Sequence, residues 1–335
     1  MRWDPDLLDG YVSTEIDLPD AARMPGEPDD VDVVATLVRR DEPSRSRRAV
    51  LYVHGWNDYF FQTHLADAWA GLGFDFYALD LRRYGRSARR GHLRGFTTDL
   101  SEYDQELDAA AAIIAEDHDQ LVVMGHSTGG LVTALWAAGR PGLVHGLVLN
   151  SPWLDLQGSA LVRAIGAPVI DALGARSPYA VLRAADPGHY ARVLHRSLEG
   201  EWDYDLDMKL SPGPPIRVGW LRAVIQGQRR VAAGLDVEAP VLVLASTRTS
   251  FARRWNEDLR VVDSVLDVEQ IAARAVRLGR HVTVVRVEEG VHDLVLSAPA
   301  VREQVFTEME RFVRAYVDAP GDRAGDGPVL GVDQP

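Results

Sequence analysis

The segment Gly125-His126-Ser127-Thr128-Gly129 decides the fold of this chain. An apolar run at 121–124 comes directly before it and a helical pattern at 131–138 follows, so Ser127 is expected at a tight turn between a strand and a helix. Backbone angles at such a turn are strained, and glycine two residues before and after the serine avoids a collision of side chains. The hydroxyl then projects from the turn, beside a helix amino end that favours developing negative charge.

The alternative interpretation of the same segment is a glycine-rich helix start with Ser127 as its capping residue. In a chain with 29 glycines the five-residue pattern alone is weak evidence. The strand before it and the helix after it favour a serine nucleophile.

Apolar runs and helical patterns alternate along the rest of the chain. Strands are expected at 31–38, 49–53, 74–79, 121–124, 143–149, 241–244 and 281–287, and helices at 62–72, 99–116, 131–138, 268–278 and 300–317. This order predicts an α/β fold with a mostly parallel, doubly wound sheet that carries helices on both faces.

An irregular, mainly helical and proline-containing stretch at 153–239 interrupts this alternation, and we interpret it as an inserted cap. The core domain would then comprise residues 1–152 and 240–317. The tail at 318–335 is rich in Pro, Gly and Asp and is expected to be disordered.

The composition excludes several kinds of chemistry. The chain of 335 residues has no cysteine, which excludes disulfides, zinc–thiolate sites and a cysteine nucleophile. A net charge of −13 argues against a nucleic-acid partner. Lys209 is the one lysine and lies in a polar, proline-rich neighbourhood, which argues against covalent lysine chemistry. Neither a metal nor another cofactor is expected.

The beginning of the chain lacks the pattern of a signal peptide, and no apolar run approaches the roughly 20 residues that a membrane helix needs. A cytoplasmic location without an integral membrane segment is therefore expected.

A serine needs a base to take its proton, and His292 is the best placed of the ten histidines. It follows the last predicted strand, so it should lie at the carboxyl edge of the sheet together with Ser127. The acid that orients it should follow the strand at 241–244, where Asp258, Asp263 and Asp267 are available. Asp263 lies in a short apolar stretch and is preferred. Asp267 precedes a helix and is the alternative, because it could instead cap that helix.

Two backbone N–H groups are expected to stabilise the oxyanion of a tetrahedral intermediate. One belongs to Thr128, which follows the nucleophile, and the other to Trp56 in the loop after the strand at 49–53. Asn57 is a weaker candidate for the second donor.

The chain also resembles the monoacylglycerol lipase and lysophospholipase-like hydrolases, which include the serine aminopeptidase S33 type. The resemblance covers roughly residues 48–317 outside the cap. It rests on His54-Gly55, the stretch at 80–87, the segment around Ser127, the stretch at 263–267, and His292-Asp293, in that order. It implies the α/β-hydrolase fold, a triad of Ser127, Asp263 and His292, and backbone oxyanion donors at Trp56 and Thr128.

The leading hypothesis is therefore a serine hydrolase of carboxylic esters, with a lipid-like small-molecule substrate of the monoacylglycerol or lysophospholipid type. The residues expected to line the substrate pocket are His54, Gly55, Asn57, His126, Trp153 and Trp220. An aminopeptidase or amidase on the same triad is the alternative, in which the acidic run at 199–207 would bind a substrate ammonium group. A non-enzymatic ligand-binding protein is a third possibility.

The arginines at 82–94 offer one further hypothesis. They could attract a phosphate group or an acidic membrane, although a salt-bridged loop is the simpler interpretation.

Overall fold

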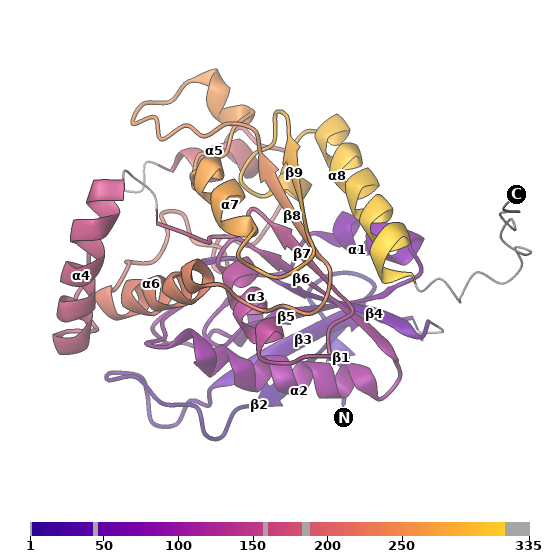
Figure 1. The fold of residues 1–335 in the computed structure, drawn as a ribbon. Helices are drawn as coiled ribbons and strands as arrows, with labels where there is room; N and C mark the ends of the chain where they lie inside the picture. The colour runs from indigo at the N-terminus through magenta and orange to yellow at the C-terminus, as the bar shows by residue number, and fades with distance from the viewer. Residues whose placement is uncertain (1, 43–45, 157–159, 183–187, 319–335) are drawn as a thin grey trace, which may run out of the picture.

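Nine strands form a single sheet in the part of the chain that a computed structural model describes, residues 2–42, 46–156, 160–182 and 188–318 (Figure 1). The order across the sheet is β1-β2-β3-β5-β4-β6-β7-β8-β9. The strands are β1 (Asp4–Pro5), β2 (Tyr11–Asp17), β3 (Val34–Arg40), β4 (Arg48–Val53), β5 (Asp75–Asp80), β6 (Gln120–His126), β7 (Gly146–Asn150), β8 (Val241–Ser246) and β9 (Val282–Val287).

The six strands from β5 to β9 in this order are mutually parallel, and β1, β2 and β3 add an antiparallel edge. The register brings the carboxyl ends together, with Val53 beside Gly125 and His126 beside Asn150. The loops that leave β4, β6, β8 and β9 therefore converge at one edge, which is where parallel sheets bind ligands.

Alternate residues of the central strands face two separate apolar cores. Leu51 and Val123 pack on one face with α2, α3 and α7, while Tyr52 and Met124 pack on the other with α1 and α8. The helices are α1 (Thr63–Gly71), α2 (Asp104–Ala115), α3 (Thr128–Ala138), α4 (Ala160–Arg176), α5 (His189–Leu194), α6 (Val218–Ala233), α7 (Val268–Ala275) and α8 (Pro299–Phe312). The doubly wound α/β architecture expected from the sequence is confirmed.

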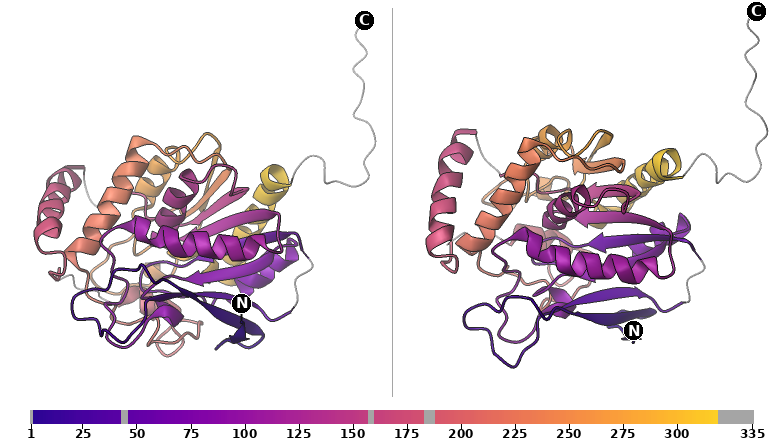
Figure 2. Two further views of the ribbon diagram at one scale, coloured as in Figure 1. Left: turned by 90° about the horizontal axis from the view of Figure 1, so that it is seen from below. Right: turned by 60° about the horizontal axis from the view of Figure 1, so that its bottom comes forward.

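Among the described residues between β7 and β8, the stretch interpreted as a cap contains three helices, α4, α5 and α6. Figure 2 shows α4 beside α6 at one end of the molecule, and the two helices pack together. Helix α6 also packs on α3, and its Trp220 and Val224 belong to the same apolar core as the sheet. The division into a core domain and a separate cap stays a prediction.

The expected elements differ from the observed ones in three places. Strands β1 and β2 were not expected, and the strand expected at 31–38 runs from Val34 to Arg40 because its pairing with β2 begins at Val34 opposite Asp17. The helix expected at 99–116 is divided: Asp99 caps a 3-10 turn by accepting a hydrogen bond from the Ser101 N–H at 2.9 Å, and α2 begins at Asp104. Of the expected disordered tail, residues 319–335 lie outside the described residues.

Among the described residues, no helix combines the length and the apolar character needed to cross a bilayer.

Candidate active site

Ser127 occupies the turn between β6 and α3 in a strained backbone conformation, with φ 53° and ψ −118°. A side chain at Gly125 would place its Cβ 2.4 Å from Thr133 Oγ1, and one at Gly129 would place it 2.2 Å from the carbonyl oxygen of His54. Both distances are shorter than real Cβ atoms tolerate. The two glycines are therefore required, because Gly125 lies tightly against the start of α3 and Gly129 against the end of β4 and the loop that follows it.

Ser127, His292 and Asp263 form a continuous chain of hydrogen bonds. His292 Nε2 lies 3.0 Å from Ser127 Oγ, and His292 Nδ1 lies 2.9 Å from Asp263 Oδ2. The serine is 7% exposed, the histidine 3% and the aspartate 0%. The three side chains come from the segments that follow three strands, β6, β8 and β9, and meet at the carboxyl edge of the sheet.

The hydrogen bonds of Asp263 determine which nitrogen of His292 carries the proton. The second carboxylate oxygen, Oδ1, accepts from the N–H groups of Val265 at 2.8 Å and Leu266 at 2.7 Å. An ionised carboxylate only accepts, so the contact at Oδ2 requires a proton on Nδ1 of the imidazole. The lone pair of Nε2 then faces the serine hydroxyl and can accept its proton, which is the arrangement that activates a serine nucleophile.

The other two candidate acids lie elsewhere. Asp267 is the N-cap of α7 and accepts a hydrogen bond from the Glu269 N–H at 3.1 Å. Asp258 is exposed in the 3-10 turn Glu257–Arg260. Of the three aspartates, Asp263 is the one that the structure brings to His292.

The loop after β4 lies directly against the nucleophile. A Cβ at Gly55 would lie 3.1 Å from Ser127 Cβ and 3.0 Å from His126 Nδ1, so glycine permits this close approach. Trp56 follows in the same loop. Thr128 begins α3, where the first N–H groups have no partner within the helix. These are the positions of the two N–H groups expected to stabilise an oxyanion.

His54 supports this loop from inside the protein. Its Nδ1 lies 2.7 Å from the carbonyl oxygen of Gly55, and its Nε2 accepts from the N–H of Leu81 at 3.1 Å. Burial lowers the pKa of the imidazole, which keeps it neutral. The side chain expected in the substrate pocket is thus engaged in holding the loop.

Three tryptophans from separate segments gather next to Ser127. The ring of Trp220 on α6 lies 5.3 Å from that of Trp56 and 5.8 Å from that of Trp153, measured between centroids. The backbone N–H of Trp153 donates to the carbonyl oxygen of Ser127 at 3.0 Å. The three rings form an aromatic cluster in which Trp220 is buried in the core and Trp56 and Trp153 are partly exposed.

A buried group of charged side chains lies on the other side of Ser127. Asp58 Oδ2 is 3.7 Å from His126 Nδ1, which is 4.0 Å from Asp293 Oδ2. Lys209 Nζ lies 2.8 Å from Asp58 Oδ1. Burial would raise the pKa of the Asp58 carboxyl, but Lys209 and His126 outweigh that effect and lower it to about 2.

The spacing of Asp58, His126 and Asp293 would also allow a cation, because one ligand atom from each lies within 4.8 Å of the others. Lys209 already supplies a positive charge to Asp58. Asp293 accepts hydrogen bonds from Asn150 at 2.7 Å and from Gln62 at 3.3 Å. We therefore assign no metal to this group.

Sequence reasoning missed two residues here. Lys209 was placed in a polar neighbourhood, but it is 7% exposed and buried among aromatic rings. Tyr190 on α5 accepts a hydrogen bond from the Asp293 N–H at 3.2 Å, and its ring lies 5.6 Å from that of His292. The one available signal was the presence of a single lysine in an arginine-rich chain.

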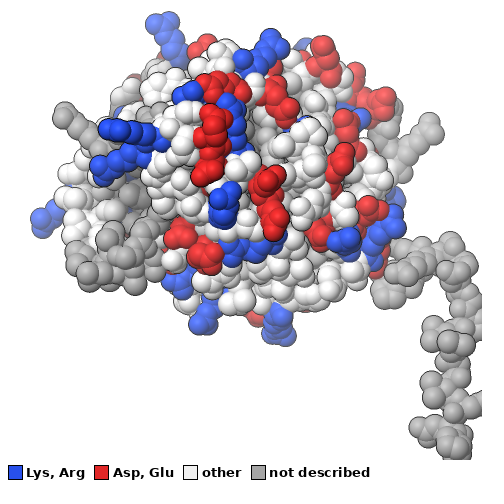
Figure 3. Space-filling view, turned by 90° about the horizontal axis from the view of Figure 1, so that it is seen from above, with Lys and Arg blue, Asp and Glu red and all other residues white. Residues whose placement is uncertain are grey.

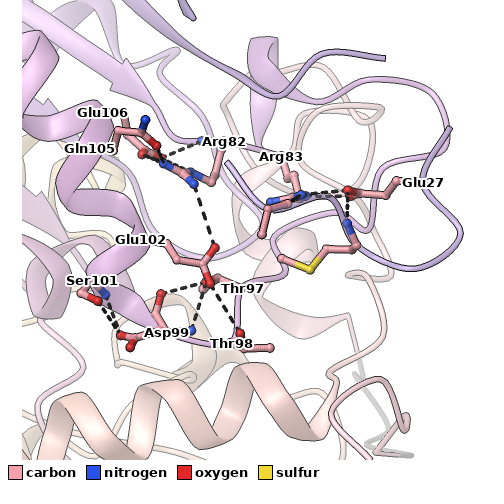
Figure 4. A network of polar contacts seen from close by, with 12 residues as sticks. Glu27, Arg82, Arg83, Thr97, Thr98, Asp99, Ser101, Glu102, Gln105 and Glu106 are labelled. Carbon is pink, nitrogen blue, oxygen red and sulfur yellow. Dashed lines mark hydrogen bonds and ion pairs between the residues drawn. The ribbon is translucent and has the colours of Figure 1, made fainter. Parts of the chain in front are cut away.

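Three of the six arginines after β5 are held in buried ion pairs and do not offer a phosphate site. Arg82 is ion-paired with Glu106, and Arg83 with Glu27 at 2.7 Å, and all four side chains are buried (Figure 4). Arg86 is likewise held by Asp6 and Asp80 at 2.7 and 2.9 Å. On the face of the molecule seen from above in Figure 3, basic side chains lie among acidic ones. The salt-bridged interpretation is correct for these three arginines.

Three of the five acidic residues in the run at 199–207 pair with arginines as well. Glu199 pairs with Arg192 and Arg260, Glu201 with Arg302, and Asp203 with Arg196 at 2.9 Å. These three carboxylates are therefore not free to bind a substrate ammonium group, while the pairs do not involve Asp205 and Asp207.

Comparison with known proteins places this geometry among hydrolases. The family described as "Serine aminopeptidase, S33" matches residues 44–254. A monoacylglycerol lipase of Mycolicibacterium smegmatis is 29% identical over 237 residues, which are 69% of this chain and 78% of that protein. The phospholipase YtpA of Bacillus subtilis is 32% identical over 111 residues, 32% of this chain and 41% of the relative.

Solved structures agree on the fold. The crystal structure of a Paleococcus ferrophilus monoacylglycerol lipase aligns with 85% of this chain and 100% of its own, with a TM-score of 0.62 and 18% identity.

Proposed function

Because the chain belongs to the serine aminopeptidase S33 family of α/β-hydrolases, we propose that it hydrolyses lipid-like carboxylic esters through an acyl-enzyme on Ser127. The observation that carries the proposal is the chain of hydrogen bonds from Ser127 through His292 to Asp263, with contacts of 3.0 and 2.9 Å. A serine with such a base is a nucleophile toward acyl carbon.

In the first half of the reaction, Ser127 Oγ attacks the ester carbonyl carbon while His292 Nε2 takes the hydroxyl proton. The oxyanion that forms is stabilised by the N–H groups of Trp56 and Thr128, each worth about 3 kcal/mol. When the intermediate collapses, the imidazolium donates its proton to the leaving alcohol. Asp263 keeps the imidazole oriented and stabilises its charged form without taking the proton.

In the second half, a water molecule attacks the acyl-enzyme. His292 Nε2 takes one proton from this water, and the carboxylic acid leaves as Ser127 regains its hydrogen. The net reaction is ester plus water to acid plus alcohol.

Two observations support a lipid-like acyl group. The partly exposed rings of Trp56 and Trp153, which lie against the buried ring of Trp220, would suit a hydrocarbon chain. Two relatives are named for lipid esters, a monoacylglycerol lipase and a phospholipase. The aminopeptidase alternative has less support, because Glu199, Glu201 and Asp203 of the acidic run at 199–207 pair with arginines.

A fluorophosphonate probe and a series of p-nitrophenyl esters test this function. We expect the probe to label Ser127, and Ser127→Ala to lose both labelling and ester turnover. Turnover should rise from acetyl to medium-chain esters and exceed that of aminoacyl anilides. An unlabelled wild type, or a Ser127→Ala variant that retains turnover, would overturn the proposal, and faster cleavage of anilides would favour the amidase.

The same proposal assigns residues 153–239 the role of a cap that shapes the acyl site. Trp220→Ala removes a large ring from the aromatic cluster. We expect the ester preference to move toward longer or bulkier chains while fluorophosphonate labelling is retained. An unchanged chain-length profile would contradict this role for Trp220. The cytoplasmic location stays a prediction, which cell fractionation can test.

A further inference from the structure

The loop after β4, residues 54–61, is tied to the segment 204–213 between α5 and α6 by several polar contacts. The side chain of Asn57 donates to the carbonyl oxygen of Leu210 at 2.8 Å and accepts from the N–H of the same residue at 3.0 Å. Tyr59 Oη accepts from the N–H of Asp205 at 2.8 Å. The pair Lys209–Asp58 lies between these contacts. The cap segment thus binds three consecutive residues of this loop.

Lys209 makes the one charged contact among these ties. Its ammonium lies 2.8 Å from Asp58 Oδ1, and the two side chains are 9% and 2% exposed. The rings of Phe61, Tyr204 and Tyr190 surround it at 5.3, 5.4 and 5.7 Å from their centroids. A compact ammonium suits such a site better than a planar guanidinium does. This is where the single lysine of the chain lies.

Burying an ion pair is not in itself a gain in stability, since removing two charges from water offsets much of their attraction. Such a pair does select one geometry, because each charge is stable only when its partner is in place. Here the geometry selected is that of the loop relative to the cap.

The loop at 54–61 depends on contacts with other segments of the chain to keep its conformation. Asn57 has a left-handed φ of 54°, which is uncommon for residues other than glycine. On one side of Trp56, Gly55 packs against Ser127. On the other side, Asn57 and Asp58 are held by Leu210 and Lys209. The N–H of Trp56 lies between these two anchored points.

We propose that Lys209 is a positioning residue which, through Asp58, holds the loop so that the Trp56 N–H is placed to stabilise the oxyanion. The inference rests on the proposed function, in which that N–H is an oxyanion donor. It makes the cap segment a part of the catalytic apparatus, beyond any role in covering the acyl site. Loss of the pair should weaken binding of the tetrahedral state more than binding of the ester.

The test uses Lys209→Met, which keeps the length of the side chain and removes its charge, and the double variant Asp58→Asn/Lys209→Met. The double variant leaves no unpaired buried charge, so it should fold even where the single variant does not. Arg222→Met is the matched control, because it removes an ion pair with Asp171 inside the cap, at 2.8 Å, and leaves the loop contacts intact. All assays are run well below each variant's Tm.

For the double variant we expect kcat on a p-nitrophenyl ester to fall about tenfold to a hundredfold, with KM within twofold of wild type. Affinity for an alkyl boronic acid, which forms a tetrahedral adduct on the serine, should fall by a similar factor. The control should keep all three values. A merely structural role predicts instead that the double variant recovers kcat together with stability.

Two results are therefore distinguishable. Should the double variant match wild type in kcat and boronate affinity, the inference about Lys209 is overturned while the serine hydrolase stands. Should Ser127→Ala retain wild-type turnover, the proposed function itself fails.

Discussion

Replacing Asp263 by asparagine should reverse one hydrogen bond and leave the rest of the site in place. The N–H groups of Val265 and Leu266 point at Oδ1 from 2.8 and 2.7 Å and need an oxygen there. The amide NH2 of an asparagine must then take the place of Oδ2, 2.9 Å from His292 Nδ1. Facing a donor, Nδ1 becomes an acceptor, and the ring proton moves to Nε2. That proton points at Ser127 Oγ from 3.0 Å, so the serine has no base.

The magnitude follows from the loss of the correct tautomer. A triad with the wrong tautomer and intact geometry loses about 10,000-fold in kcat, which corresponds to about 5.5 kcal/mol of transition-state stabilisation. The free energy of unfolding should change by only about 1 kcal/mol, because the new side chain has the same shape and keeps both backbone hydrogen bonds.

The assay combines steady-state turnover of p-nitrophenyl butyrate, with the active sites titrated, and unfolding in urea. Asp267→Asn is the matched control. Asp267 caps α7, and asparagine caps a helix about as well as aspartate, so both kcat and stability should stay near wild type. The reasoning is refuted if Asp263→Asn keeps kcat within tenfold of wild type, or if Asp267→Asn loses as much.

Three further predictions concern the buried charges. Glu106→Gln removes the fully buried carboxylate partner of Arg82, leaving the longer contact to Glu102 at 4.0 Å, and should lower the free energy of unfolding by about 3 kcal/mol, measured in urea, with kcat unchanged at permissive temperature. The pKa of Asp58 is about 2 in the folded protein, below its ordinary value, so its ionised form stabilises the fold above about pH 4 and that stability is lost as the pH falls toward 2. Compared with Asp58→Asn/Lys209→Met, the wild type should lose about 2 kcal/mol more between pH 6 and pH 2, and parallel pH curves would contradict this. Lys209 should resist reductive methylation in the native protein and react in urea, as peptide mass spectrometry can follow, and rapid native modification would show that its burial is wrong.

The central sheet could be predicted from the sequence because its strands are buried on both faces. Strands such as β4 and β6 are continuous apolar runs, which stand out between helical patterns. Strand β2 alternates buried and exposed residues, and β1 has two exposed residues, so neither offers such a run. Their pairing at the antiparallel edge depends on contacts with β3, which lies 17 residues or more along the chain from β2.

One part of the candidate site could also be predicted from the sequence, and another part could not. Ser127 and His292 each follow a strand of the parallel sheet, so the topology alone places both at one edge. The choice among three aspartates needed the structure. The expectation that Asp267 could cap the following helix is confirmed, but the selection of Asp263 depends on how the long loop after β8 folds, through the isolated bridge between Thr249 and Asp263.

Two residues of the stretch at 153–239, which we propose to be a cap, could not be predicted from the sequence. Lys209 lies in an irregular segment and Tyr190 in the short helix α5, and the burial of both depends on packing against the core, which no sequence periodicity indicates. Once docked, Tyr190 lies against the loop of His292, and Lys209 lies against the loop of Trp56. One inserted stretch therefore contacts both the base and the proposed oxyanion donor. The same stretch carries Trp220, which the proposed function places at the acyl site, so rate and chain-length preference should vary together among variants of this stretch.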